Sequence, residues 1–262
     1  MADRDGAPIW YELMTDAPDA AESFYGAVMG WTFEKTQGAM GRDYRIFTAA
    51  DGEPVGGLVK ALDGACFAPL WAVYFSAADV DVAAEKVAAL GGAIDMEPQD
   101  IPGVGRLAFV ADPQGARFYL MRVDADAGGA AFAPKKPGHC VWNELAARDQ
   151  KAALAFYGAL FGWEKAGAMP MGGGMGDYTF IKSGETEIGA MMDAPEGAAA
   201  PLWNFAFQVP DIDAAKAAIE AGGGTIRHGP MELPVGGDWL TQATDPQGAR
   251  VMFTGARKRG AA

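Results

Sequence analysis

The residues of this chain that are best suited to acid–base chemistry stand in a motif that occurs twice. The motif is Trp-x-Glu-Leu, which begins at Trp10 and again at Trp142. Side chains two apart on a strand share a face, so each glutamate, Glu12 and Glu144, lies on the side of its tryptophan. Desolvation beside an indole raises the pKa of a carboxyl group, which can then act as a general base or hydrogen-bond acceptor. The structural alternative is that each glutamate pairs with an arginine or caps backbone amides.

These motifs belong to a duplication that runs through the chain. The hexapeptide Asp-Pro-Gln-Gly-Ala-Arg begins at Asp112 and again, letter for letter, at Asp245, and a Phe-Tyr pair ends at Tyr25 and at Tyr157. A Trp-led apolar run also recurs inside each copy, which indicates two modules per copy. The predicted parts are a first domain (1–123), a linker (124–137) and a second domain (138–262).

Each module shows the same order of predicted elements. The first has a strand at 7–15, a helix at 18–29 and strands at 31–35, 44–49 and 54–59. The helix starts at a proline and ends at a glycine, and glycine-bearing turns separate the strands. One strand, one helix and three strands give βαβββ four times over. The sequence therefore predicts an α+β fold.

Composition limits the classes of partner. The chain has 262 residues, a formal charge of −13 and a pI near 4.5. An acidic surface repels phosphate backbones, so we expect no nucleic-acid partner. The charged N-terminus does not resemble a signal peptide, and no apolar run approaches the roughly 18 residues of a membrane span, so we expect no membrane partner. These features predict a cytoplasmic protein.

Histidine and cysteine are scarce. His139 and His228 are interpreted as surface or turn residues rather than metal ligands. Cys66 and Cys140 fall at unrelated positions in the two copies, which favours free thiols in a reducing cytoplasm over a disulfide framework. The sequence contains no Ser/His/Asp set, phosphate-binding loop, dinucleotide fingerprint or paired Cys-x-x-Cys.

The chain resembles the vicinal oxygen chelate superfamily, which includes glyoxalase I, ring-cleaving dioxygenases and bleomycin resistance proteins. The resemblance rests on the Phe-Tyr pair with Gly-Trp after it, on an Asp-rich helix start at Asp79 and Asp211, and on Asp-Pro-Gln-Gly before the last strand of each copy. It is closest to two-domain bacterial glyoxalase-like members. It implies that paired βαβββ modules form half-open barrels whose concave faces hold the ligand.

The resemblance also implies a divalent metal, bound on the first and last strands of paired modules. The corresponding positions here are Trp10, Ala72, Tyr119, Trp142, Asn204 and Met252. Divalent ions need several oxygen or imidazole ligands, which these residues do not supply. We therefore predict no metal and no other cofactor. A divalent metal stays the alternative, if Glu12 and Glu144 recruit further ligands.

Side chains of the concave faces are predicted by the same alternation. Besides the two tryptophans and two glutamates, the candidate ligand-binding residues are Tyr44, Tyr74, Tyr119, Tyr178, Asn204, Gln208 and Met252. An aromatic and thioether-rich pocket with few polar groups suits a small molecule, although the same residues suit a plain core. A Gly- and Met-rich segment, 167–177, is either a mobile lid or a flexible hairpin.

The leading hypothesis is a metal-independent protein that holds a small apolar or aromatic molecule, either to bind or sequester it or to act on it, with Glu12 and Glu144 as tentative catalytic residues. The alternative is a metal-dependent glyoxalase, lyase, epimerase or dioxygenase. As an enzyme, the chain would be lyase-, isomerase- or dioxygenase-like. A third hypothesis is that one copy has lost its cavity and serves as a dimerisation or scaffolding half. The expected protein partner is a second copy of the chain, in a homodimer.

Overall fold

The computed structural model describes residues 5–38, 41–61, 69–124, 131–195, 197, 201–234 and 236–258. Cys66 and the middle of the predicted linker, 125–130, lie outside these ranges. In chain order the elements are β1 (Pro8–Thr15), α1 (Pro18–Met29), β2 (Thr32–Gln37), β3 (Asp43–Thr48), β4 (Pro54–Lys60), β5 (Leu70–Ser76), α2 (Val80–Ala89), β6 (Ala93–Ile101), β7 (Gly105–Ala111), β8 (Arg117–Val123), β9 (Cys140–Ala147), α3 (Gln150–Phe161), β10 (Glu164–Pro170), β11 (Asp177–Ser183), β12 (Thr186–Asp193), β13 (Leu202–Val209), α4 (Ile212–Ala221), β14 (Thr225–Glu232), β15 (Trp239–Thr244) and β16 (Arg250–Gly255).

The order strand, helix, three strands therefore occurs four times, as the sequence predicts. The strands form two eight-stranded mixed sheets, ordered β2-β3-β4-β1-β5-β8-β7-β6 and β10-β11-β12-β9-β13-β16-β15-β14. In both, the first strand of each module runs parallel to the last, and the remaining hairpin partners are antiparallel. Each sheet has two free edges, so neither is a closed barrel. The predicted α+β fold with four βαβββ modules is confirmed.

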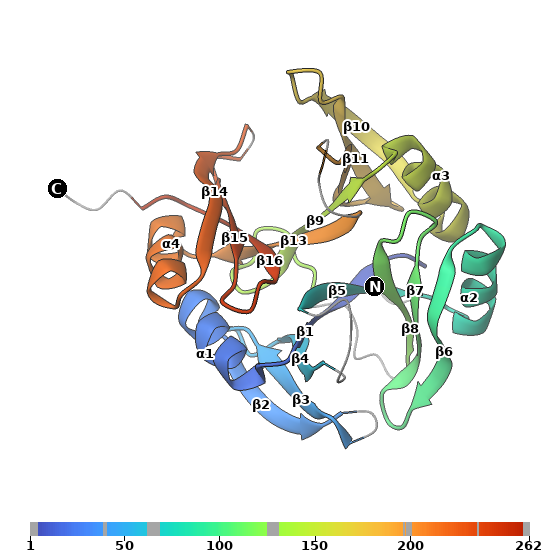
Figure 1. Cartoon of the computed structure of the whole chain (residues 1–262), viewed down its shortest axis with the longest axis horizontal. Coiled ribbons are helices and arrows are strands. Elements are labelled where there is room, and N and C mark those ends of the chain that lie inside the picture. The colour runs from blue at the N-terminus through green and yellow to red at the C-terminus, as the bar shows by residue number, and fades with distance from the viewer. Residues whose placement is uncertain are drawn as a thin grey trace. The chain divides into compact units, whose positions relative to one another are not determined.

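The chain packs as two compact units that do not follow the duplication. Unit 1 comprises Met1–Trp10, Ala72–Gly129 and Trp142–Asn204, and unit 2 comprises Tyr11–Trp71, Ala130–Val141 and Phe205–Ala262. Within unit 1, α2 lies beside α3, and within unit 2, α1 lies beside α4 (Figure 1). Each unit thus joins one module from each copy. The division at 123 and 138 remains a prediction about the repeat.

The repeated motifs meet in a buried polar network in unit 1. The Tyr157 hydroxyl donates to Asp112 Oδ2 at 3.3 Å and accepts from Trp203 Nε1 at 3.2 Å. The other Asp112 oxygen accepts the backbone N–H groups of Gln114 and Ala116. Burial raises the pKa of both Tyr157 and Asp112. The Phe-Tyr helix, the Trp-led strand and the Asp-Pro-Gln-Gly turn therefore recur together because their side chains form one hydrogen-bonded network.

Unit 2 contains the second copy of this network. Tyr25 donates to Asp245 Oδ2 at 2.9 Å and accepts from Trp71 Nε1 at 3.0 Å. Burial again raises the pKa of Tyr25 and of Asp245. In each unit the tyrosine comes from one copy of the repeat and the aspartate from the other, so the network ties the copies together.

The two networks differ at the helix start beside the turn. In unit 1, Gln114 Oε1 accepts the backbone N–H groups of Arg148 and Asp149 at 2.8 and 2.9 Å, while Gln114 Nε2 donates to the Asp149 carbonyl at 2.8 Å. In unit 2, the N-cap of α1 is Ala17, whose N–H donates to Thr15 Oγ1 instead. Gln247 Oε1, which corresponds to Gln114 Oε1, is buried and has no hydrogen-bond partner among the residues that the structure describes.

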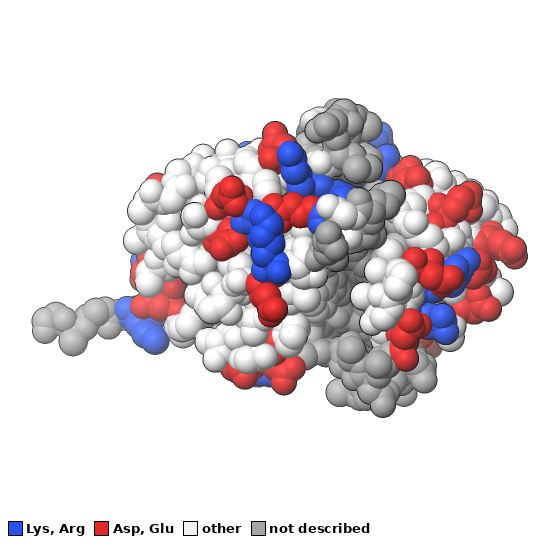
Figure 2. All heavy atoms as spheres, turned by 90° about the horizontal axis from the view of Figure 1, so that it is seen from below, with Lys and Arg blue, Asp and Glu red and all other residues white. Residues whose placement is uncertain are grey.

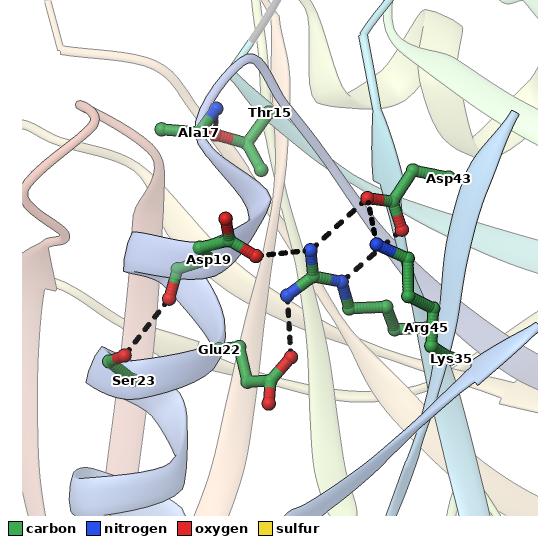
Figure 3. Close-up of polar contacts among 8 residues, drawn as sticks. All are labelled: Thr15, Ala17, Asp19, Glu22, Ser23, Lys35, Asp43 and Arg45. Carbon is green, nitrogen blue, oxygen red and sulfur yellow. Dashed lines mark hydrogen bonds and ion pairs between the residues drawn. The ribbon is translucent and has the colours of Figure 1, made fainter.

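A buried arginine fastens α1 to β3 within unit 2. The Arg45 side chain is 5% exposed, and its guanidinium contacts Asp19 and Glu22 on α1 and Asp43 on its own strand (Figure 3). Lys35 also pairs with Asp43 at 3.0 Å. These donors hold the pKa of the Asp43 carboxyl below its usual range.

His139 corrects part of a sequence prediction. It was expected at the surface or in a turn, and its backbone N–H does close a turn on the Lys136 carbonyl at 3.2 Å. Its side chain, however, is fully buried, and Nε2 lies 3.0 Å from Asp51 Oδ2. Lys136 Nζ lies 2.5 Å from the same oxygen. The turn between β3 and β4 thus supplies the Asp51 carboxylate as a hydrogen-bond acceptor for the buried His139 imidazole. This contact anchors the segment before β9. His228 is exposed, as expected, but lies in β14 rather than in a turn.

Basic side chains on the surface lie beside acidic ones. On the face shown in Figure 2, Lys and Arg side chains lie next to Asp and Glu side chains rather than gathering into a patch. Arg106 with Asp81 and Arg117 with Asp95 are such pairs, at 2.6 and 2.8 Å.

Candidate functional site

The site that the structure assembles lies in unit 1, on the face of β9–β12 that points away from α3. Along β9, Asn143 and Leu145 are fully buried on one face, and Trp142 and Glu144 point to the other. Ala190 of β12 is the register partner of Glu144, and Phe180 of β11 is the partner of Ala190. The face therefore continues from the first strand of the module across its last two.

A hydrogen-bonded chain joins the two residues of the Trp-x-Glu motif through a tyrosine from β11. The Trp142 Nε1–H donates to the Tyr178 hydroxyl at 2.8 Å, and that hydroxyl donates to Glu144 Oε2 at 2.9 Å. Sequence reasoning named all three residues as site candidates but did not connect them. The connection depends on the register of β9, β12 and β11, which no local pattern reveals.

Burial controls the electrostatics of this chain. Glu144 is 6% exposed, and desolvation raises its pKa, while the hydrogen bond from Tyr178 acts in the opposite direction. Burial and the neighbouring carboxylate raise the pKa of Tyr178 well above its usual value. The proton of this hydrogen bond therefore stays on Tyr178. Glu144 is left as an acceptor whose second oxygen is available to a ligand or to a transferred proton.

Apolar side chains surround the carboxylate. The Phe180 ring lies edge-on to Trp142, at 6.0 Å between centroids, and to Tyr178, at 5.8 Å. Met169 of β10 is the register partner of Tyr178, and Met192 continues the face two residues after Ala190. Sequence reasoning missed Phe180 and Met192, although the alternation along 177–183 and 186–193 could have found them.

The segment 167–177, interpreted from the sequence as a lid or a flexible hairpin, is a hairpin loop flanked by strand residues. Residues 167–170 belong to β10, and only 171–176 form the loop, with Gly172, Gly173, Gly174 and Gly176 in the left-handed region. Non-glycine residues rarely adopt that backbone, which explains the glycine run. Met175, at the tip of this hairpin, is 52% exposed.

The other predicted site residues of unit 1 have different surroundings. Tyr74 and Tyr119 are register partners and stack on each other, with centroids 4.1 Å apart and planes at 14°. Phe109 packs against Tyr119 at 4.4 Å, and all three rings are nearly buried. Trp10 and Asn204 are half-buried on β1 and β13.

The remaining predicted residues belong to unit 2. Glu12 is 4% exposed on β1, and the Tyr44 hydroxyl lies directly over Gly57, the register partner of Glu12, where only a glycine leaves room. Gln208 and Met252 lie on β13 and β16, each nearly buried.

The residues around Glu144 do not fit a divalent metal. Its neighbours are a phenol, an indole, a phenyl ring and thioethers, which are poor ligands for the ions that carboxylates bind. Throughout the described ranges, no three side chains of His, Cys, Asp or Glu come together as a metal site would require. No chemical step is therefore assigned to a metal here.

Comparison with known proteins agrees with this fold. The family model described as "Glyoxalase/Bleomycin resistance protein/Dioxygenase superfamily" matches residues 8–120 and 136–253. The chain belongs to this superfamily. Among the parts that the structure describes, no helix is long and apolar enough to cross a membrane.

Individual relatives span nearly the whole chain. "Putative glyoxylase CFP32" of Mycobacterium bovis is 32% identical over 94% of this chain and 93% of its own length. "Anthracycline biosynthesis protein DnrV" of Streptomyces peucetius is 31% identical over 93% of this chain and 91% of its own. The Mn(II)-bound glyoxalase of Novosphingobium aromaticivorans has a similar structure, with a TM-score of 0.66 at 19% identity over 97% of this chain and 83% of its own.

Proposed function

We propose that this protein binds a small, largely apolar or aromatic molecule on the β9–β12 face of unit 1, without a metal ion. The observation that carries the proposal is the chain from Trp142 through Tyr178 to Glu144, which leaves one carboxylate oxygen as the polar group of an otherwise apolar face. A ligand with an acidic O–H or N–H would donate to that oxygen while its rings contact Trp142 and Phe180.

The electrostatics support a neutral, donor-bearing ligand. A desolvated carboxylate gains more from a donated hydrogen bond than an exposed one, because water no longer competes. An anionic ligand would add a second negative charge beside Glu144, which costs free energy in a poorly solvated site. Two relatives are named for anthracycline biosynthesis, and anthracyclines are fused-ring aromatic compounds, which agrees with an aromatic ligand class.

The same geometry suits proton transfer. A general base works best when its pKa is raised towards the working pH, and burial moves the pKa of Glu144 in that direction. If the protein is an enzyme, we infer that Glu144 takes a proton from carbon or oxygen of the bound molecule, which is isomerase or lyase chemistry. We also propose that the protein is cytoplasmic and forms a homodimer. Light scattering of the purified protein tests the homodimer.

Fluorescence titration with 2-naphthol and naphthalene tests the site. The two probes share their rings, but only 2-naphthol donates a hydrogen bond. We expect Glu144→Gln to weaken 2-naphthol binding by about tenfold or more, as for one bond to a charged group, and to leave naphthalene binding unchanged. Glu164→Gln, at an exposed position on β10, is the matched control.

Elemental analysis of the purified protein separates this proposal from its alternative. We expect no stoichiometric divalent metal, and 2-naphthol binding that is insensitive to a chelator. One tightly bound ion per chain, together with binding or turnover that is lost with chelator and restored by metal, would establish the metal-dependent alternative instead.

A further inference from the structure

A second face with uncommitted polar groups lies in unit 2, on β13, β15 and β16. Helix α4 packs on one side of these strands, where Trp239 lies under Arg257, which pairs with Asp213 of α4. Alternation puts Leu240 and Gln242 on the opposite side. Register pairing adds Thr254 beside Leu240 and Met252 beside Gln242.

Gln208 completes this face. It is the register partner of Thr254 on the neighbouring parallel strand, so the two side chains stand next to each other, with backbones about 4.8 Å apart. Both are nearly buried, at 8% and 4% exposure, while Leu240 and Gln242 beside them are half-buried. The face is therefore shielded from bulk water, and its rim is partly open.

The Thr254 hydroxyl is buried without a hydrogen bond inside the described part of the chain. No donor or acceptor of the described residues reaches its Oγ1. A buried hydroxyl without a partner destabilises a folded protein, so each one calls for an explanation. A valine would have the same shape without this cost. The hydroxyl is explained if it binds something that comes from outside.

The side-chain amide of Gln208 is oriented by the carboxylate of Asp238. Gln208 Nε2 donates to Asp238 Oδ2 at 3.2 Å. Because an ionised carboxylate only accepts hydrogen bonds, the amide nitrogen must face Asp238, and Oε1 must face away from it. An acceptor with a fixed direction, Gln208 Oε1, thus stands next to an uncommitted hydroxyl that can donate, Thr254 Oγ1.

We propose that Thr254 and Gln208 form a binding subsite for a neutral molecule that carries a hydrogen-bond donor and a carbonyl acceptor side by side, as a carboxamide does. The ligand N–H donates to Gln208 Oε1, the Thr254 hydroxyl donates to the ligand carbonyl, and the rest of the molecule lies on Met252 and Leu240. Asp238 disfavours anions. The subsite uses no residue of the β9–β12 face and does not depend on the function proposed for it.

Titration of the full chain with benzamide, followed by protein NMR, tests the subsite. Acetophenone, which keeps the carbonyl but lacks the N–H, and benzoate, which is an anion, are the comparison probes. We expect benzamide to shift the Thr254 and Gln208 resonances and to bind at least about fivefold more tightly than either comparison probe, which is the effect of about one hydrogen bond.

Two threonine variants provide the matched comparison. Thr254→Val removes the proposed donor, and Thr241→Val removes a hydroxyl that is equally buried and unpartnered but points to the α4 side. Neither variant should lower the melting temperature. We expect Thr254→Val to weaken benzamide binding by about fivefold, and Thr241→Val to change it by less than about twofold. Gln208→Met, which removes the acceptor, should also weaken benzamide binding.

The outcomes decide the proposal. Loss of benzamide affinity in Thr254→Val and Gln208→Met, but not in Thr241→Val, supports it. If benzamide shifts other resonances, or binds equally to all variants, or binds no better than acetophenone, the Thr254 hydroxyl serves only an internal water and the proposal is wrong. Glu144→Gln leaves this subsite intact, so benzamide should bind that variant with unchanged affinity. A negative 2-naphthol test at the β9–β12 face therefore does not decide the benzamide test.

Discussion

Replacing Tyr178 by phenylalanine removes one hydroxyl on which both Trp142 and Glu144 depend. The bond to Glu144 has a charged acceptor, so its loss costs about 1.5–3 kcal/mol of unfolding free energy when the carboxyl is ionised. The Trp142 indole is half-buried and can turn to water, so its lost acceptor adds at most about 1 kcal/mol. We therefore expect Tyr178→Phe to destabilise the protein by about 2–4 kcal/mol at pH 7.

This penalty should depend on pH in a defined direction. Because the pKa of Glu144 is raised in the folded state, protonation of its carboxyl group stabilises the folded protein. This contribution to the unfolding free energy is fully present below the unfolded pKa of about 4.3, and it is lost as pH rises through the folded pKa. Tyr178 reduces that loss, because its hydrogen bond favours the carboxylate. Near pH 4 the carboxyl group is protonated with or without Tyr178, and the cost of Tyr178→Phe should fall to about 1 kcal/mol, as for a neutral hydrogen bond.

Urea unfolding at pH 7 and pH 4, followed by tryptophan fluorescence and circular dichroism, measures both values. The matched background is Glu144→Gln, which keeps the shape but carries no charge. In that background Tyr178→Phe should cost about 1 kcal/mol at either pH, which gives a coupling energy of about 1–3 kcal/mol at pH 7. The reasoning is refuted if the penalty is the same at both pH values, or if it does not change in the Glu144→Gln background.

Three further predictions concern the contacts that hold each unit together. Gln114→Ala should lower the unfolding free energy by about 1–2 kcal/mol, because two backbone N–H groups lose their acceptor. Gln247→Ala should change the unfolding free energy by no more than about 0.5 kcal/mol, and equal effects of the two variants in chemical denaturation would contradict this. Tyr157→Phe should cost about 1–3 kcal/mol at pH 7 and less near pH 4, because Asp112 loses its donor while ionised; a thermal-melt series over this range checks it. Asp51→Asn should cost about 1 kcal/mol at pH 7, a modest value because the Asp51 side chain is 32% exposed. Because the pKa of Asp51 is lowered in the fold, this difference should persist above the unfolded value of about 3.9 and shrink as pH falls below it; a cost that grows towards acid would refute the assignment.

Local patterns in the sequence were sufficient for the modular fold. Turn residues, period-two alternation and helix-start signals act over a few residues, so the order βαβββ and most element limits could be read directly. The helix expected at 18–29 is α1, Pro18–Met29, and the strand expected at 54–59 is β4, Pro54–Lys60. The segment at 167–177, for which a lid and a flexible hairpin were both predicted, lies in the β10–β11 hairpin, and its residues 167–170 belong to the edge strand β10.

Side-chain environment was harder to predict, and His139 shows why. An imidazole next to a predicted linker has every local sign of exposure. It is buried because Asp51, far away in sequence, supplies an acceptor at 3.0 Å. The candidate site has the same character: alternation put Trp142 and Glu144 on one face, but the Tyr178 hydroxyl that joins them arrives through strand pairing.

The sequence by itself thus determined that four βαβββ modules exist, where their motifs lie, and that few good metal ligands occupy the family's positions. Only the tertiary structure decided that the compact units join modules from different copies and that Tyr157 meets Asp112 while Tyr25 meets Asp245. It alone also left Thr254 with an unused hydroxyl beside a fixed amide. The physical reason is range: turns and alternation are set by neighbours in sequence, whereas burial, register and hydrogen-bond satisfaction are set by residues that only folding brings together.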